Sequence, residues 1–260
     1  MEILLDGRSA LITGGSQGLG RAMAKEFCDS GANVAIVARK QDALDAAVAE
    51  ISKTGRGKVI AVAADVSTAE GCKQAFAAAV KAFGQVDILV NNAGTSTRGP
   101  FEQVTDEAWQ ADLDLKLFAA IRLSRLAFPG MKERRFGRII NTLNNGAKAP
   151  QAEGAPTAVS RAAGMSLTKI LSKEGAAHNV LVNGLLVGKI RSNQWEARHE
   201  ASGSNENVEA YYEDAGKELP MGRLGLAEEF AALACFLASD AGGYISGTAI
   251  NVDGALCPVV

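Results

Sequence analysis

Three glycines near the amino terminus have the spacing needed to hold a phosphate group. The apolar run 10–12 is typical of a buried strand, and Gly14, Gly18 and Gly20 follow it before a helical pattern over 21–30. Glycine lets a backbone approach a phosphate closely because it has no Cβ. A helix that opens at such a turn directs free N–H groups and its positive dipole end towards the phosphate. The spacing therefore predicts a nucleotide-binding turn.

Strand-like and helix-like patterns alternate along almost the whole chain, and they position this turn. Apolar strands are expected at 10–12, 33–38, 58–63, 87–90, 138–143, 180–185 and 249–252. Helical spacing covers 21–30, 41–53, 68–83, 106–131, 158–174 and 227–238. Such alternation predicts an α/β fold, a Rossmann-type doubly wound sheet of about seven parallel strands with helices on both faces. One domain over 1–260 accounts for the length.

Composition excludes several other classes of protein. Apolar residues make up 47% of the 260, and the net charge of −2 includes no basic cluster that would follow a nucleic acid. Four widely spaced cysteines without a CxxC pair favour reduced thiols, and two histidines leave little for a metal site. The acidic first seven residues are too short for a signal peptide, so we expect none, and we expect no membrane span because no apolar run is long enough. We expect a cytoplasmic protein that binds neither nucleic acid nor membrane.

The stretch 189–218 interrupts the alternation. It is polar and contains Trp195, His199, Tyr211 and Tyr212. A long insertion after a strand's carboxyl end is where a doubly wound fold covers its ligand, so we predict a mobile substrate lid. The alternative is a plain surface excursion in which the aromatic side chains only anchor the segment to the core.

Further motifs occur in order with the glycine turn, and together they resemble the short-chain dehydrogenase/reductase family over essentially the whole chain. The matching segments are TGGSQGLG at 13–20, DV at 65–66, NNAG at 91–94, GRIIN at 137–141, VN at 182–183, PMGRLG at 220–225, SG at 246–247 and VDG at 252–254. The resemblance implies a seven-stranded Rossmann sheet, a nicotinamide dinucleotide cofactor and a small-molecule substrate.

The resemblance also implies a set of cofactor-binding residues. They are Gly14, Ser16, Gln17, Gly18, Leu19, Gly20, Asp65, Val66, Asn92, Ala93, Gly94, Arg161, Gly188 and Ile190. An acidic residue at the end of the second strand would select NAD by binding the ribose 2′-hydroxyl. Here Ala38 is followed by Arg39 and Lys40, which suit a 2′-phosphate, so NADP(H) is favoured over NAD(H). Alternatively, Arg39 and Lys40 are only a solvated helix start.

The four catalytic positions implied by the resemblance carry unusual residues. The tyrosine and lysine of a Y-x-x-x-K motif correspond to Thr157 and Arg161, and no Y-x-x-x-K exists in the chain. The serine corresponds to Asn144 and the helix asparagine to Lys116. A threonine hydroxyl is far less acidic than a phenol, and an arginine is always protonated, so the usual tyrosine-dependent mechanism is not expected. The amide of Asn144 can still donate to a carbonyl oxygen.

Lys116 is the group that could take over proton transfer. Next to Arg161 in a partly dry pocket, its pKa would be lowered by like charge and by desolvation. In the alternative interpretation, Lys116 points to solvent or pairs with a carboxylate at the pocket rim, such as Glu153. Lys148 and Glu153 are expected close to any ligand, and His178 is expected at a helix end.

These observations leave three functions open. The first is an NADP(H)-dependent oxidoreductase acting on a small carbonyl or alcohol with a non-standard active site. The second is a dinucleotide-binding sensor or assembly protein without turnover, and the third is a non-redox enzyme on the same fold. The helices 106–131 and 158–174 resemble those that pair between subunits of the family, so we expect a homodimer or homotetramer.

Overall fold

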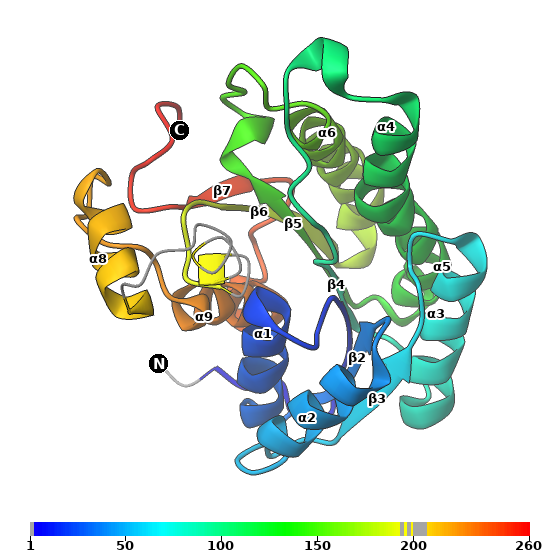
Figure 1. The fold of residues 1–260 in the computed structure, drawn as a ribbon. Helices are drawn as coiled ribbons and strands as arrows, with labels where there is room; N and C mark the ends of the chain where they lie inside the picture. Colours follow the sequence, from blue (N-terminus) through cyan, green and yellow to red (C-terminus); the bar gives the residue numbers. More distant parts are fainter. Residues whose placement is uncertain (1–2, 193–194, 197–198, 200–206) are drawn as a thin grey trace.

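The protein, seen in a computed structural model, forms one parallel sheet between two layers of helices (Figure 1). The structure describes residues 3–192, 195–196, 199 and 207–260. Within them the sheet has seven strands in the order β3-β2-β1-β4-β5-β6-β7. The strands are β1 (Ser9–Thr13), β2 (Asn33–Ala38), β3 (Val59–Ala63), β4 (Ile88–Asn91), β5 (Gly137–Asn144), β6 (Val180–Val187) and β7 (Ala249–Val252). The predicted fold class is confirmed.

The helices cover both faces of the sheet, as the unbroken apolar strands require. All residues of β1 and β4 are buried, because a parallel strand has no solvent-facing side. One face carries α1 (Gly18–Asp29), α2 (Gln41–Ile51) and α9 (Ala227–Ala238), which share one core cluster. The other face carries α3 (Ala69–Phe83), α4 (Asp106–Leu113), α5 (Ala119–Arg134) and α6 (Thr157–Gly175).

The region 106–131 differs from the single helix predicted for it. A π turn over Asp114–Phe118 separates α4 from α5. A π turn is one residue wider than an α turn, and hydrophobic spacing carries no signal for so small an insertion. Lys116 lies in this turn and is buried. Pairing of these helices between subunits stays a prediction.

The order of the strands places a crevice at the carboxyl edge of the sheet. The chain builds β1, β2 and β3 in one direction and then returns to place β4 on the other side of β1. The connections that follow β1 and β4 therefore run to opposite sides. Ligands of doubly wound folds bind at this switch point. The glycine turn after β1 lies directly there.

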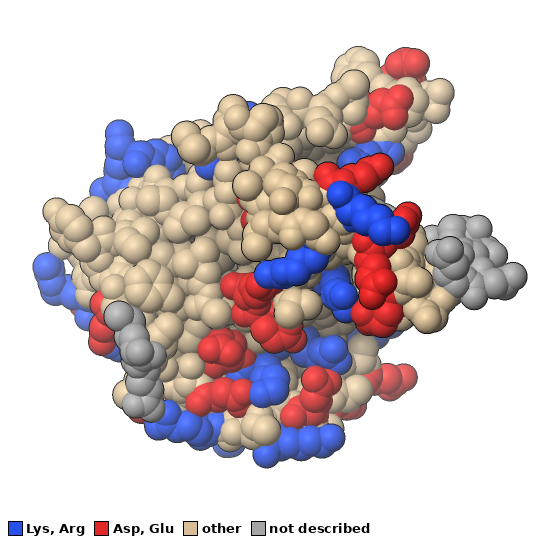
Figure 2. All heavy atoms as spheres, turned by 90° about the vertical axis from the view of Figure 1, so that its left-hand side faces the viewer, with Lys and Arg blue, Asp and Glu red and all other residues tan. Residues whose placement is uncertain are grey.

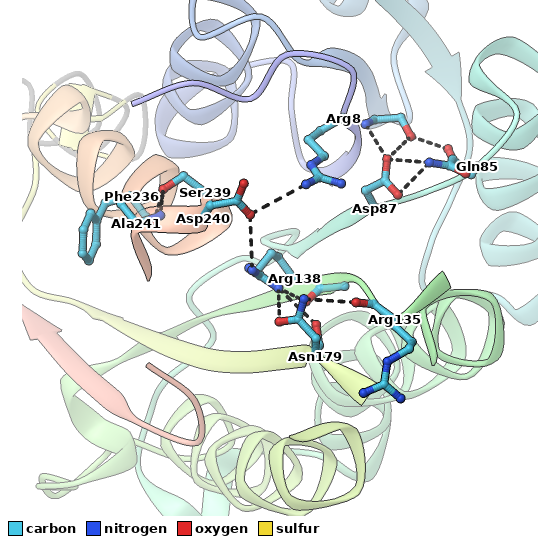
Figure 3. A network of polar contacts seen from close by, with 12 residues as sticks. Arg8, Gln85, Asp87, Arg135, Arg138, Asn179, Phe236, Ser239, Asp240 and Ala241 are labelled. Carbon is cyan, nitrogen blue, oxygen red and sulfur yellow. Dashed lines mark hydrogen bonds and ion pairs between the residues drawn. The ribbon is translucent and has the colours of Figure 1, made fainter. Parts of the chain in front are cut away.

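A separate polar network closes the amino-terminal edge of the sheet (Figure 3). Arg138, at the start of β5, is buried and donates from Nη1 to the backbone oxygen of Asn179 at 3.1 Å. The guanidinium groups of Arg8 and Arg138 stack on the Phe136 ring at 3.5 and 4.3 Å, and both pair with the exposed Asp240. Burial lowers the pKa of Arg138 to about 10, against the attraction of Asp240. We read this network as structural.

Figure 2 shows the face of the molecule that lies on the left in Figure 1, where α8 (Val208–Lys217) and the carboxyl terminus are found. Basic and acidic side chains alternate over its lower part, whereas its upper part is mostly uncharged. Interspersed charges of both signs produce only a weak long-range field. Of the helices that the structure describes, none combines the length and the hydropathy needed to cross a bilayer.

Candidate functional site

A cleft of about 490 Å³ opens at the carboxyl edge of the sheet. Ligand sites for small molecules have volumes of about 300–1,000 Å³. Every residue predicted to bind the cofactor lies in its lining: Gly14, Ser16, Gln17, Gly18, Leu19, Gly20, Arg39, Lys40, Asp65, Val66, Asn92, Ala93, Gly94, Arg161, Gly188 and Ile190. The fold therefore brings residues from five separate loops to one cleft.

Gly18 and Gly20 show two different reasons why the turn needs glycine. Gly18 has φ +52°, in the left-handed region, and a Cβ there would meet only Ser192, at 3.9 Å, so it would project into open space. A Cβ at Gly20 would lie 2.1 Å from the backbone oxygen of Gly14. Gly20 therefore permits the close packing of helix against turn, and Gly18 leaves the cleft open.

The amino terminus of α1 is suited to an anion. Its N-cap residue Gln17 makes no side-chain capping hydrogen bond, and the first turn contains no acidic residue within the described chain. The first N–H groups of a helix have no partner inside the helix and carry the positive end of its dipole. These donors suit the pyrophosphate of a dinucleotide, and the fit rests on this uncapped end and on the open Gly18 position.

Thr13 fixes the loop after β4 beside the glycine turn. Its Oγ1 accepts from the backbone N–H of Asn92 at 2.9 Å and of Ala93 at 3.0 Å, and donates to the oxygen of Val90 at 3.2 Å. The Asn92 amide in turn donates to the oxygen of Thr13 at 2.9 Å. This double link holds Gly94 at the floor of the cleft.

The far end of the cleft combines two cations with one carboxylate. Arg39 and Lys40 follow β2, and both side chains are exposed. Burial raises the pKa of Asp65, but hydrogen bonds from Ser67 and the attraction of Arg39 outweigh it, so the pKa lies below its ordinary value. Asp65 is therefore ionised at neutral pH, and this end keeps a net positive charge.

A buried ion pair lies behind the other end of the cleft. Lys116 Nζ contacts Asp112 Oδ2, and the two side chains are 1% and 0% exposed. Nζ also donates to Thr157 Oγ1 at 2.7 Å, while Ser160 Oγ donates to Asp112 Oδ1 at 2.6 Å. Lys116 does pair with a carboxylate, as the alternative interpretation expected, but the partner is the buried Asp112 one helical turn earlier and not Glu153, and Lys116 does not point to solvent.

Of the four positions assigned to catalysis, three line the cleft. Asn144, Thr157 and Arg161 are in the lining, whereas Lys116 lies behind Thr157 and reaches the cleft only through its hydroxyl. Thr157 Oγ1 accepts from Lys116 Nζ and from Thr97 N at 3.1 Å, which occupies both lone pairs. Its proton faces Thr97 O at 2.8 Å or Asp112 Oδ2 at 3.1 Å. The hydroxyl can therefore serve a ligand only as a donor, after its proton turns away from these two acceptors.

Burial shifts the pKa values of both cations. The pKa of Lys116 is lowered to about 8, mainly by desolvation and also by the like charge of Arg161, while the hydrogen bond and charge of Asp112 act in the opposite sense. Desolvation also lowers the pKa of Arg161 to about 10, against the attraction of Asp112. The Arg161 side chain lies over Gly94, where a Cβ would be 2.5 Å from Nη2. It makes no hydrogen bond to any residue in the described ranges.

The loop after β5 contributes less charge than expected. Asn144 Oδ1 is buried and has no partner among the described residues. Lys148 donates to the oxygen of Ala249 at 2.7 Å, and Glu153 is exposed. Neither Lys148 nor Glu153 is in the lining of the cleft, so the prediction that both lie next to a ligand is wrong. Their side chains are directed to β7 and to solvent instead.

The predicted lid is described only in part. Residues 193–194, 197–198 and 200–206 of the segment 189–218 lie outside the described residues. Trp195 lines the cleft, and the His199 ring stacks on Tyr211 at 4.8 Å. Tyr212 is 5% exposed and packs with Leu219 and Leu224 in a small core cluster. An aromatic contribution to the cleft therefore comes from Trp195, while Tyr212 anchors the segment.

Sequence reasoning missed the partners of Lys116. Asp112 contacts Lys116, Thr97 contacts the Thr157 hydroxyl that Lys116 binds, and Ser160 donates to Asp112. One signal was available, because an Asp and a Lys four residues apart lie on the same helical face. No local pattern pointed to Thr97 or Ser160, which reach the site from a loop and from α6.

Comparison with known proteins identifies the family. The model of the short chain dehydrogenase family matches residues 8–203. D-beta-hydroxybutyrate dehydrogenase from Cupriavidus necator is 34% identical over 96% of this chain and 98% of that protein. Acetoacetyl-CoA reductase from Shinella zoogloeoides is 33% identical over 95% and 97%.

A solved structure gives the same result. L-sorbose reductase from Gluconobacter frateurii, complexed with NADPH and L-sorbose, superposes with a TM-score of 0.94 at 34% identity, with 100% of both chains covered. The sheet order, the glycine turn and the cleft described above fit this likeness. The chain belongs to the short-chain dehydrogenase/reductase family, whose relatives named here are oxidoreductases.

Proposed function

We propose that this chain is an NADP(H)-dependent oxidoreductase that acts on a small carbonyl or alcohol compound. The observation that supports it best is the cleft itself, whose lining combines the uncapped amino terminus of α1 with Arg39 and Lys40. The NADPH held by the sorbose reductase supports the choice of cofactor. The names of the two curated relatives, a dehydrogenase and a reductase, support the reaction class.

The preference for NADP(H) rests on the end of β2. The strand ends at Ala38 with no carboxylate to bind a ribose 2′-hydroxyl, and a guanidinium can form two hydrogen bonds to a 2′-phosphate. The alternative, that both cations are a solvated helix start, has support of its own, because Lys40 is the N-cap residue of α2 and both side chains are exposed. Binding measurements separate the two.

Arg39→Asp is the variant for that measurement, with Lys53→Met as the control. Loss of a charge-assisted contact to the phosphate costs about 1.5–3 kcal/mol, so the Kd for NADPH should rise by about 10- to 150-fold. The Kd for NADH should not rise. Lys53 is exposed beyond the end of α2 and outside the cleft, so its variant should bind NADPH normally. An equal loss for both cofactors, or a clear preference of the unaltered protein for NADH, refutes the assignment.

We also propose a non-standard active site, in which Lys116, Asn144, Thr157 and Arg161 stand in the four catalytic positions. NADPH held by the residues that line the cleft would supply a hydride for the carbonyl carbon of a substrate. As the carbonyl π bond breaks, its electron pair on oxygen takes the proton of the Thr157 hydroxyl. Thr157 Oγ1 takes a proton from Lys116 Nζ at the same time, which avoids a free alkoxide. A group of pKa about 8 is matched to this task at neutral pH.

A second function is favoured by one observation. Among the described residues that line the cleft there is no tyrosine, and a threonine hydroxyl is a weak acid. A protein that binds the dinucleotide as a sensor or assembly subunit, without turnover, would show the same cleft. The two functions differ in whether bound NADPH is consumed.

The test combines binding with turnover. Stabilisation of the protein by NADPH, followed by NADPH oxidation with members of a panel of small aldehydes and ketones, supports the oxidoreductase. In the Asp112→Asn/Lys116→Met double variant, which keeps the buried pair neutral, turnover should fall while NADPH binding is retained. Stabilisation without oxidation by any carbonyl would establish the binding function instead, and unchanged turnover in the double variant would refute the role of Lys116.

A further inference from the structure

Asp112 is the most completely enclosed charged side chain next to the cleft. Its side chain is 0% exposed, and it lies on α4 four residues before Lys116. Oδ1 accepts from Ser160 Oγ at 2.6 Å, and Oδ2 contacts Lys116 Nζ and lies 3.1 Å from Thr157 Oγ1. A single carboxylate thus contacts every polar group that determines where the Lys116 ammonium points.

The charges that face Lys116 come from two elements. Asp112 approaches from α4, and the Arg161 guanidinium approaches from α6. Desolvation and the like charge of Arg161 both favour a neutral amine at position 116, and only Asp112 favours the ammonium. Without Asp112, two buried cations would lie side by side with no counter-charge, and Lys116 would lose its proton first.

Asp112 also determines the direction in which Nζ points. The ion pair and the hydrogen bond to Thr157 Oγ1 converge on the same ammonium, so the carboxylate keeps Nζ within 2.7 Å of the hydroxyl. Ser160 in turn keeps the carboxylate oriented, because its hydroxyl occupies the oxygen that faces away from Lys116. The chain of contacts from Ser160 through Asp112 and Lys116 ends at the hydroxyl that lines the cleft.

We propose that Asp112 is a positioning residue for proton transfer, since its carboxylate holds the Lys116 ammonium against the Thr157 hydroxyl. This inference rests on the proposed function. In the reaction, Lys116 passes one proton to Thr157 and becomes a neutral amine, and Asp112 stays ionised throughout. Asp112 makes no contact with the cleft and takes no part in cofactor binding.

The Asp112→Asn variant tests this role, with Asp114→Asn as its matched control. An asparagine keeps the size of the side chain and an acceptor for Ser160, and it removes the charge together with the acceptor oxygen that Lys116 contacts. Asp114 lies on the same helical segment but pairs with Arg122 at 3.1 Å. Carbonyl reduction needs a protonated Lys116, so its rate should fall as pH rises through about 8 in the unaltered protein.

In Asp112→Asn the pH at which the reduction rate has fallen by half should be lower by at least one pH unit. At a given pH above this midpoint the rate is then about tenfold lower than in the unaltered protein. The KM for NADPH should not change, whereas a merely structural role would weaken the cofactor site as well. Asp114→Asn should keep the midpoint near 8. An unmoved midpoint in Asp112→Asn would overturn the proposal.

A second readout does not need turnover. In protein labelled with ε-13C lysine, the Lys116 signal can be assigned by its loss in Lys116→Arg, and its chemical shift follows protonation of Nζ. Its titration midpoint should fall in Asp112→Asn, and by a smaller amount in Ser160→Ala, which keeps the charge and serves if Asp112→Asn does not fold. An unchanged NMR midpoint contradicts the role of Asp112. A shifted midpoint in a protein that oxidises no NADPH contradicts the oxidoreductase function and the catalytic use of Asp112 together.

Discussion

Removal of one partner of the Asp112–Lys116 pair should destabilise the folded protein far more than removal of both. Lys116→Met leaves the Asp112 carboxylate buried at 0% exposure, with only Arg161 as a nearby counter-charge. Breaking a buried pair in this way costs about 3–5 kcal/mol, and we expect the lower end because Arg161 remains. For a chain of this size, about 3 kcal/mol corresponds to a fall in Tm of about 6–12 °C.

The double variant Asp112→Asn/Lys116→Met provides the comparison. A neutral pair of similar volume is often as stable as the ion pair that it replaces, so this variant should lie within about 1 kcal/mol of the unaltered protein. Lys73→Met is the surface control, because the Lys73–Glu70 pair is 63% and 82% exposed and such pairs contribute at most about 1 kcal/mol. Urea unfolding at one protein concentration, followed by circular dichroism at pH 7, measures all three.

The free energy of unfolding should also depend on pH in a direction that the pKa of Lys116 determines. The pKa of Lys116 is about 8 in the folded protein and 10.5 for an unperturbed lysine. Between these values the unfolded chain holds a proton that the folded chain has released, so the contribution of Lys116 makes stability rise with pH across that window. Lys116→Met lacks this contribution. The reasoning is refuted if Lys116→Met unfolds at the urea concentration of the unaltered protein, or if the double variant is as unstable as the single one.

Two further variants separate the cofactor edge of the sheet from its opposite edge. Gly20→Ala brings a Cβ to 2.1 Å from the oxygen of Gly14, so the turn must shift. We expect the affinity for NADPH, measured by fluorescence titration, to weaken at least tenfold. Normal binding would show that the turn is not the cofactor site. Arg138→Met removes the hydrogen bonds from the Arg138 guanidinium to Asn179 at the amino-terminal edge of the sheet. The free energy of unfolding should fall by about 2–3 kcal/mol, and the affinity for NADPH should be retained. Loss of NADPH affinity in the folded variant would contradict a purely structural role.

The sequence alone determined the architecture and the cofactor cleft. Strands such as β2 and β7 were predicted to the residue, because both are short, mostly apolar runs between polar or glycine-containing segments. The residues that line the cleft were also predictable, because the glycine turn and the family resemblance named them and the ends of parallel strands meet at one edge of the sheet. Both results follow from local composition combined with a topology that has few alternatives.

Only the tertiary structure decided the environment of Lys116. Its burial depends on a π turn that hydrophobic periodicity does not reveal, and its hydrogen bond to Thr157 joins segments 41 residues apart. Its pKa depends on desolvation, on Asp112 and on Arg161, and these are properties of the packed site. Charge interactions of this kind vary with distance and burial in three dimensions, and neither quantity is encoded in a local sequence pattern.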